Sequence, residues 1–286
     1  MARLKGIPVL FWLVWLFVQG FQGSTAAAAI KPDETILYRK VNKHKLYLHM
    51  FYPKDKKNNP GRVPAAIFFF AGGWRSGKPK QFYPHARHLA KKGMLGISAE
   101  YRIRNKHGTK PFDALEDAKS AIRFIRKNAK KLGIDPKKII AAGASSGGQL
   151  AAAAATVSGY NAKGDDLSIS AVPNALVLFN PVYDNSPNGY GYGLIGEAYK
   201  KFSPLHNISP KMPPAIVMLG TEDAIIPVAT AKKFRRLMRK AGVQSELRIY
   251  QGQPHGFFNY HRSKKYYRLT VKEMDSFLKG LGLMKR

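Results

Sequence analysis

Residues 138–155 read KIIAAGASSGGQLAAAAA, and this stretch decides the fold. Its first part, Lys138–Ala144, is a mostly apolar run of the kind found in a strand buried on both faces. Its second part, Gln149–Val157, is rich in alanine and predicts a helix. Gly143-Ala144-Ser145-Ser146-Gly147, a G-x-S-x-G sequence, joins the two with no room for a loop. We therefore expect a buried strand that turns sharply into a helix around a serine.

Strand and helix patterns alternate outward from this stretch in both directions. The expected strands are Ile36–Lys40, Lys45–Tyr52, Ala65–Phe70, Met94–Ala99, Lys138–Ala144, Ala175–Phe179, Ala215–Leu219 and Glu246–Tyr250. The expected helices are Phe82–Lys92, Pro111–Leu132, Gln149–Val157, Val228–Ala241 and Lys264–Leu281. Such alternation predicts an α/β fold with a mostly parallel central sheet and helices on both faces. Right-handed crossovers bring the carboxyl ends of parallel strands to one edge, where ligands of open α/β sheets bind.

The serine motif is typical of a nucleophile held on a strained turn. Small residues two positions before and after the serine let such a turn close, and Gly143 and Gly147 stand at those positions around Ser145. Ser146 is a rival nucleophile, but its corresponding neighbours are Ala144 and Gly148. A tight Gly/Ser turn without chemistry is the simpler alternative.

Two later strands are followed by residues that complete a catalytic triad. Asp223 follows Ala215–Leu219 and is the expected acid, with Glu222 as its alternative. His255 follows Glu246–Tyr250 and is the expected base, and His206 is the only rival histidine worth keeping. A carboxylate next to imidazole fixes its tautomer and stabilises the imidazolium formed in the reaction. The chain order Ser, Asp, His is the order expected of α/β-hydrolases.

Phe70-Ala71-Gly72-Gly73-Trp74 follows the strand Ala65–Phe70. Backbone N–H groups in a glycine loop can stabilise the oxyanion of an acyl-transfer transition state. We expect Gly72 and Gly73 to supply two donors and the N–H of Ser146 a third. A plain glycine turn is the alternative.

These motifs together resemble the α/β-hydrolase superfamily, close to its exported, acetyl-xylan-esterase-like branch of esterases and lipases. The resemblance covers nearly all of the chain after its N-terminal segment. It is carried by Phe70–Trp74, Tyr101-Arg102, Gly143–Gly148, Gly220–Asp223 and Pro254–Asn259. Such families often have His-Gly-Gly-Gly in the oxyanion loop, whereas Phe70 and Ala71 take the first two places here.

The resemblance implies a serine esterase with no metal and no organic cofactor. Short acyl groups on a polysaccharide are the expected substrates, and a lipase, a broad carboxylesterase or a related exopeptidase is the alternative. Residues 182–214, between two late strands, are long enough for a short cap or one wall of the cleft. The expected substrate contacts are Trp74, Tyr190, Tyr192 and Phe257. Their aromatic rings also suit simple packing.

The first residues predict export. Residues 1–29 run from a basic start through an uncharged apolar stretch to small residues, which is the order of a secretory signal peptide. An uncleaved membrane anchor is the alternative, and no membrane span is expected after cleavage. Residues 30–286 then form one catalytic domain. The chain has no cysteine, which excludes disulfides and a thiol nucleophile.

The chain is strongly basic, with 48 Lys and Arg residues against 17 Asp and Glu and a net charge of +31. A field of this sign attracts acidic polymers. A lysine-rich surface without a specific role is the simpler explanation, and we expect no specific nucleic-acid partner. The charge also keeps open a function of another class, a polyanion-binding protein whose triad is idle.

Overall fold

The computed structural model describes residues 29–54 and 62–285, and its centre is an eight-stranded sheet. The strands are β1 (Glu34–Val41), β2 (His44–Phe51), β3 (Val63–Phe69), β4 (Leu95–Ala99), β5 (Ile134–Ala144), β6 (Ala175–Phe179), β7 (Ala215–Glu222) and β8 (Ser245–Pro254). Their order across the sheet is β1-β2-β4-β3-β5-β6-β7-β8. The pairs β1–β2 and β2–β4 are antiparallel, and the other five neighbouring pairs of this sheet are parallel. The predicted mostly parallel sheet is confirmed.

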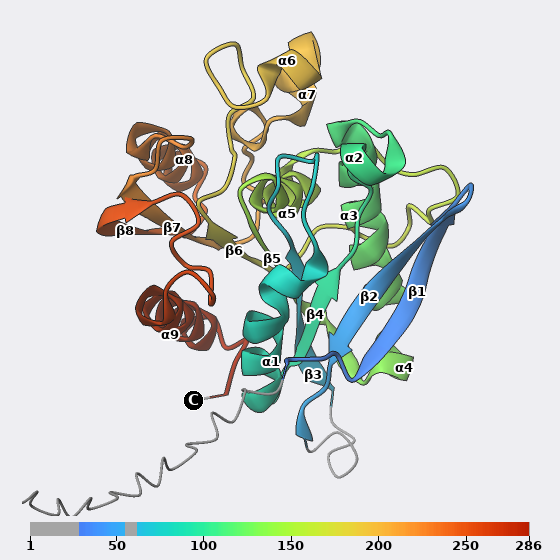
Figure 1. The fold of residues 1–286 in the computed structure, drawn as a ribbon. Helices are drawn as coiled ribbons and strands as arrows, with labels where there is room; N and C mark the ends of the chain where they lie inside the picture. Colours follow the sequence, from blue (N-terminus) through green and yellow to red (C-terminus); the bar gives the residue numbers. More distant parts are fainter. Residues whose placement is uncertain (1–28, 55–61, 286) are drawn as a thin grey trace, which may run out of the picture.

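Helices cover both faces of the sheet (Figure 1). The longer ones are α1 (Tyr83–Lys91), α3 (Pro111–Lys127), α5 (Ser146–Thr156), α8 (Val228–Lys240) and α9 (Lys264–Gly280). Right-handed crossovers place α1 opposite α3, α5 and α8, because the chain moves across the sheet in opposite directions through them. The final helix α9 joins the side of α1, where the Tyr267 hydroxyl donates to the Pro84 carbonyl. Together they form the α/β-hydrolase fold.

The long helix predicted over Pro111–Leu132 is divided in two. α3 ends at Lys127, and a short helix, α4 (Ala129–Leu132), follows it. The side chain of Asn128 donates to the Phe124 carbonyl at 2.8 Å and so takes up an acceptor at the end of the first helix. This kind of local bond competes with helix continuation, which explains the break.

The segment 182–214 contains only short helices. These are α6 (Tyr192–Ile195), η3 (Gly196–Ala198), α7 (Tyr199–Phe202) and η4 (Pro204–His206). They lie at the top of Figure 1, above the carboxyl ends of the parallel strands. That position agrees with a small cap or cleft wall.

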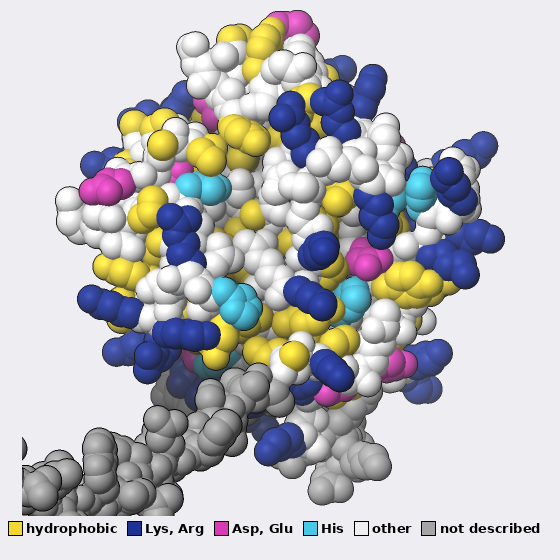
Figure 2. Space-filling model, viewed as in Figure 1, with side chains coloured by type: hydrophobic (Ala, Val, Ile, Leu, Met, Phe, Trp, Pro, Cys, Tyr) yellow, Lys and Arg dark blue, Asp and Glu magenta, His cyan; other side chains and the backbone are white. Residues whose placement is uncertain are grey.

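The predicted signal peptide covers residues 1–29. Its residues 1–28 lie outside the described residues. Within the described ranges, no helix has the length and apolar character needed to cross a membrane. Figure 2 shows Lys and Arg side chains scattered over the visible face, with few Asp and Glu side chains between them.

Candidate active site

Ser145 occupies the turn between β5 and α5. Its backbone has φ 51° and ψ −121°, a conformation that is strained for a residue with a side chain. A Cβ atom on Gly143 would lie 2.3 Å from the Gly147 carbonyl oxygen, and one on Gly147 would lie 2.1 Å from that of Phe69. Both motif positions therefore require glycine. The turn presents Ser145 at the carboxyl edge of the sheet.

His255 and Asp223 meet at the same edge, in the segments at the ends of β8 and β7. The Nδ1 atom of His255 lies 2.7 Å from Oδ2 of Asp223. The other carboxylate oxygen accepts hydrogen bonds from the N–H groups of Ile225 and Ile226, each at 2.9 Å. The Asp223 side chain is fully buried, so these three contacts fix its orientation. The carboxylate of Asp223 accepts a hydrogen bond from a proton on Nδ1 of His255, which leaves Nε2 of the ring as the proton acceptor.

The rival residues lie elsewhere. Glu222 is exposed and makes no contact with His255 among the described residues, although it stands next to Asp223. His206 is exposed in the cap, where its ring meets Tyr199. Ser146 is fully buried as the first residue of α5.

Asn180 is a polar residue of the site that the motifs did not reveal. It directly follows β6, has φ 33° and is 1% exposed. Its Nδ2 lies 3.2 Å from Nε2 of His255, and its Oδ1 accepts the Gly256 N–H at 3.1 Å. In the described structure His255 Nε2 bonds to Asn180 and not to Ser145. Catalytic hydrogen bonds are often long before substrate binds, so this arrangement is compatible with a resting triad. The only signal in the sequence was its place after a predicted strand.

The glycine loop after β3 has the geometry of an oxyanion loop. Gly72 has φ 137° and Gly73 has φ 62°. Neither N–H donates a hydrogen bond within the described part of the chain. Ser146 stands at the first position of α5, where N–H groups have no partner inside the helix. These are the three donors expected from the sequence.

Side chains from two other segments hold this loop. The Tyr101 hydroxyl donates to the Phe70 carbonyl at 2.7 Å, and the two rings stack with centroids 4.1 Å apart. The Ala71 N–H donates to Oε1 of Gln81, whose Nε2 donates to Asn259. Asn259 in turn donates to the Gly256 carbonyl. Gln81 and Asn259 therefore connect the oxyanion loop to the loop of His255, and no sequence motif indicated either residue.

Two of the expected substrate contacts are core residues. Trp74 is 2% exposed, and its Nε1 donates to Gln149 of α5. Phe257 is 1% exposed and packs between Tyr250 and Tyr266. The prediction that these rings form the pocket mouth is wrong for Phe257, whose ring is used in packing. Trp74, although mostly buried, still lines a cleft beside Gly73, so its contact with substrate stays a prediction.

The two cap tyrosines differ from each other. Tyr190 is 36% exposed, and its hydroxyl lies against Gly73, only 2.6 Å from where a Cβ atom of that residue would be. Tyr192 donates its hydroxyl to Glu197 within the cap. Tyr190 thus touches the oxyanion loop, whereas the polar end of Tyr192 is used inside the cap.

No group of three or more His, Cys, Asp or Glu side chains that could hold a metal ion occurs among the residues the structure describes. The chemical groups that the site offers are a serine at a strained turn, an imidazole oriented by a carboxylate, and backbone N–H groups that are free to donate.

The chain is similar to known hydrolases in sequence and in fold. Residues 48–177 match the family described as BD-FAE, and residues 184–279 match the dienelactone hydrolase family. Thermogutta terrifontis esterase 2, in its apo form, superimposes with a TM-score of 0.84 at 40% identity, over 88% of this chain and 96% of that one.

Two curated relatives are more distant and longer. Esterase LipC of Mycobacterium tuberculosis is 29% identical over 73% of this chain, and an acetylxylan esterase of Xylanibacter ruminicola is 26% identical over 70%. The chain spans 56% and 42% of the lengths of these two relatives.

Proposed function

Because this chain belongs to the esterases of the α/β-hydrolase superfamily, we propose that it hydrolyses carboxylic esters through an acyl-enzyme on Ser145. The observation that carries the proposal is the 2.7 Å contact between His255 and the buried carboxylate of Asp223, at the sheet edge where the strained turn presents Ser145. This arrangement is the one an activated serine needs. Thermogutta terrifontis esterase 2 phosphorylated by paraoxon is among the similar structures, which further supports a nucleophilic mechanism.

The residues act in two half-reactions. His255 Nε2 takes the proton of Ser145 as the serine oxygen attacks the ester carbonyl, and Asp223 stabilises the imidazolium. The N–H groups of Gly72, Gly73 and Ser146 stabilise the oxyanion. His255 then protonates the leaving alcohol. Water then attacks the acyl carbonyl as it gives a proton to His255. The carboxylic acid leaves as His255 passes that proton to the oxygen of Ser145, which restores the serine and the neutral imidazole.

The substrate that we propose is a short acyl ester, acetyl above all, on a polysaccharide. Structures of the Thermogutta esterase carry bound propionate and butyrate, and one relative is an acetylxylan esterase. The cap consists of helices of three or four residues, which gives little apolar surface for a long acyl chain.

The test is hydrolysis of p-nitrophenyl esters from acetate to decanoate and release of acetate from acetylated xylan. We expect the largest kcat/KM for acetate, propionate or butyrate. A fluorophosphonate probe should label Ser145, as located by peptide mass analysis. A protein that hydrolyses no ester while binding acidic polymers would instead support the polyanion-binding alternative.

Export is a separate proposal that rests on the residue order of positions 1–29. Expressed with its own N-terminus in a bacterium, the protein should be recovered outside the cytoplasm with a new N-terminus near Thr25–Ala29. Full-length protein that stays in the cytoplasm would overturn this proposal and leave the esterase untouched.

A further inference from the structure

A cleft of about 530 Å³ lies beside the oxyanion loop. Three parts of the chain line it: the loop itself, the segment after β4, and the cap. The lining residues are Gly73, Trp74, Arg75, Arg104, Gly108, Thr109, Lys110, Pro111, Gly193 and Leu194. Gly73 is a proposed oxyanion donor, so a substrate whose carbonyl oxygen sits on that N–H has this cleft next to it.

Backbone hydrogen bonds fix the main chain that carries Arg75 and Arg104 at the cleft. The Arg104 N–H donates to the Trp74 carbonyl at 2.9 Å, and the Asn105 N–H donates to the Arg75 carbonyl at 3.0 Å. These bonds hold the oxyanion loop against the start of α2 (Arg104–His107). Lys110, which stands just before α3, lines the same cleft. Three exposed basic residues therefore line one cleft, and the lining contains no Asp or Glu.

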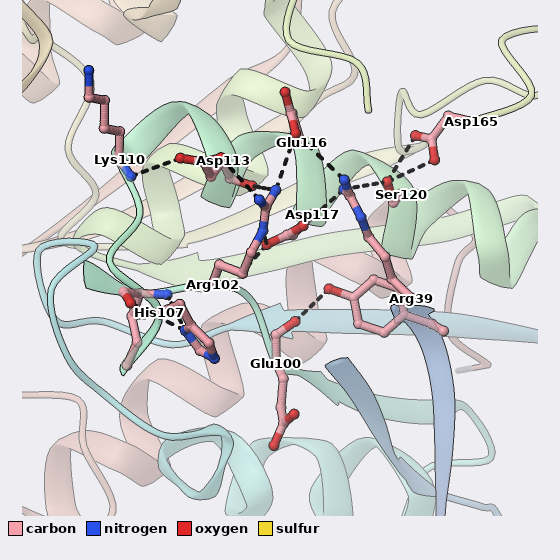
Figure 3. Close-up of polar contacts among 12 residues, drawn as sticks. Arg39, Glu100, Arg102, His107, Lys110, Asp113, Glu116, Asp117, Ser120 and Asp165 are labelled. Atoms are coloured by element: carbon pink, nitrogen blue, oxygen red, sulfur yellow. Dashed lines mark hydrogen bonds and ion pairs between the residues drawn. The ribbon is translucent and has the colours of Figure 1, made fainter. Parts of the chain in front are cut away.

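The acidic side chains that could neutralise them are held elsewhere (Figure 3). Arg102 contacts Asp113, Glu116 and Asp117, at 3.0, 3.2 and 2.8 Å. Arg39 adds a second contact to Asp117 at 2.9 Å. The carboxylates at the start of α3 are thus bound by two guanidinium groups, those of Arg39 in β1 and of Arg102 after β4.

Within the described part of the chain, the three basic residues of the cleft have no ion-pair partner. In Figure 3 only the backbone N–H of Lys110 meets Asp113, and its side chain extends away from the acidic cluster. Across residues 29–54 and 62–285, no ion pair involves Arg75, Arg104 or Lys110. Unpaired cations gathered beside a reaction centre attract and orient an anionic group of the substrate.

Building on the proposed esterase, we propose that this cleft binds a carboxylate of the ester substrate, as in an acylated polysaccharide with acidic sugar residues. The scissile carbonyl occupies the oxyanion loop at Gly73. The carboxylate, on the alcohol side of the ester, lies between Arg75, Arg104 and Lys110. The positive charge of these three side chains thus favours anionic substrates at the site itself. This effect is separate from the general attraction of the basic surface for acidic polymers.

The experiment compares esters that differ in charge and hardly in shape. The alcohol-side pair is meta-acetoxybenzoate and meta-acetoxybenzamide. The acyl-side pair is the p-nitrophenyl monoester of glutaric acid and p-nitrophenyl glutaramate. For each pair the measured quantity is the ratio of kcat/KM for the anionic ester to that for the neutral one. We expect a ratio of about ten or more for the alcohol-side pair, falling as salt is added, because exposed charges are screened.

Arg75→Gln, Arg104→Gln and Lys110→Gln each remove one charge and keep the backbone hydrogen bonds. Each should lower the ratio about three- to fivefold, the effect of one exposed ion pair. Lys232→Gln, an exposed lysine of α8, is the matched control and should leave the ratio unchanged. The neutral ester reports any general damage to the site.

A wild-type ratio near one for both pairs overturns the inference, and so does a high ratio that the three variants leave in place. A high ratio confined to the acyl-side pair overturns the assignment to the alcohol side. In each of these cases the neutral esters are still hydrolysed and the proposed esterase stands. Only a wild-type protein inactive on all four esters removes the proposed function and this inference together.

Discussion

The amide of Asn180 joins the ring of His255 to the backbone that follows it. Its Nδ2 lies 3.2 Å from Nε2 of His255, and its Oδ1 accepts the Gly256 N–H at 3.1 Å. Since the N–H of Gly256 can only donate, the oxygen of the amide must face it and the NH₂ group must face the ring. Nε2 is therefore an acceptor here, which agrees with a proton on Nδ1 facing Asp223. In the reaction Nε2 must exchange Asn180 for the hydroxyl of Ser145.

Asn180→Ala should lower kcat about ten- to hundredfold with little change in KM, because it loosens the placement of the base and touches no part of the substrate. The rate of fluorophosphonate labelling of Ser145 should fall in parallel. Asn128→Ala is the control, since it removes an amide hydrogen bond at the far end of α3. Normal kcat and labelling in Asn180→Ala would show that the contact is incidental.

Gly73→Ala should impair transition-state stabilisation through the oxyanion loop. The position has φ 62°, and its new Cβ atom would lie 2.6 Å from the Tyr190 hydroxyl. We expect kcat to fall about a hundredfold, as for the loss of one oxyanion donor. Tyr190→Phe removes the clashing oxygen and leaves the next ring atom 3.7 Å away.

The double variant Gly73→Ala/Tyr190→Phe should therefore recover part of the kcat lost in Gly73→Ala. The recovery should be incomplete, because the left-handed backbone of residue 73 remains unfavourable for alanine. If kcat of the double variant falls by the product of the two single-variant losses, Tyr190 and Gly73 do not interact.

The parts of the site that could be predicted are those set by local sterics. Gly143 and Gly147 are required because backbone atoms approach within a few ångströms at one turn, and this requirement is visible in five consecutive residues. The parallel sheet likewise follows from alternation of apolar strands and amphipathic helices. The order of Ser145, Asp223 and His255 along the chain then follows from the fold.

The parts that could not be predicted depend on contacts between distant segments. Gln81 and Asn259 are 178 positions apart and meet only when the short helix η2 (Pro79–Phe82), just before α1, and the loop of His255 are packed. An aromatic residue type likewise does not reveal which way its ring faces. Phe257 was expected at the pocket mouth, but packing against the rings of Tyr250 and Tyr266 holds it in the core.

The buried His85 should make the protein sensitive to acid. Its ring is fully buried among aromatic rings, including those of Phe82, Phe179 and Tyr267. Burial lowers its pKa to about 3, with His88 as a minor cause, from about 6.5 in an exposed position. Between these values the unfolded chain binds a proton that the folded chain does not. The free energy of unfolding therefore decreases as the pH falls from about 6.5 towards about 3, and His85 adds no pH dependence above that window.

His85→Phe should remove this contribution. Denaturant titrations at several pH values between 4 and 6.5 should give a dependence on pH that is weaker by nearly one proton than in the wild type. His261→Gln, at an exposed histidine, should leave the slope as it is. Parallel curves for His85→Phe and the wild type would mean that another group carries the acid sensitivity.

Asp223→Asn should nearly abolish ester hydrolysis, with a fall in kcat of about a thousandfold or more. The N–H groups of Ile225 and Ile226 require an oxygen at the Oδ1 position. The new NH₂ group must then face Nδ1 of His255 and donate to it. This places the imidazole proton on Nε2, so that the ring can no longer take the proton of Ser145. Kinetics on p-nitrophenyl acetate measure the loss, and an active Asp223→Asn would mean that another group orients the base.

Ser145→Ala and His255→Ala should each leave almost no activity, and the double variant should be little worse than either, because the groups act as one unit. Ser146→Ala is the matched control. It retains the backbone N–H assigned to the oxyanion and loses a fully buried hydroxyl, so most of the activity should survive. An inactive Ser146→Ala beside an active Ser145→Ala would place the nucleophile one residue later. Ester hydrolysis in both serine variants would rule out the serine mechanism. The backbone of residue 145 is as strained with alanine as with serine, so Ser145→Ala could also affect folding. Circular dichroism of each variant therefore separates loss of the nucleophile from loss of the fold.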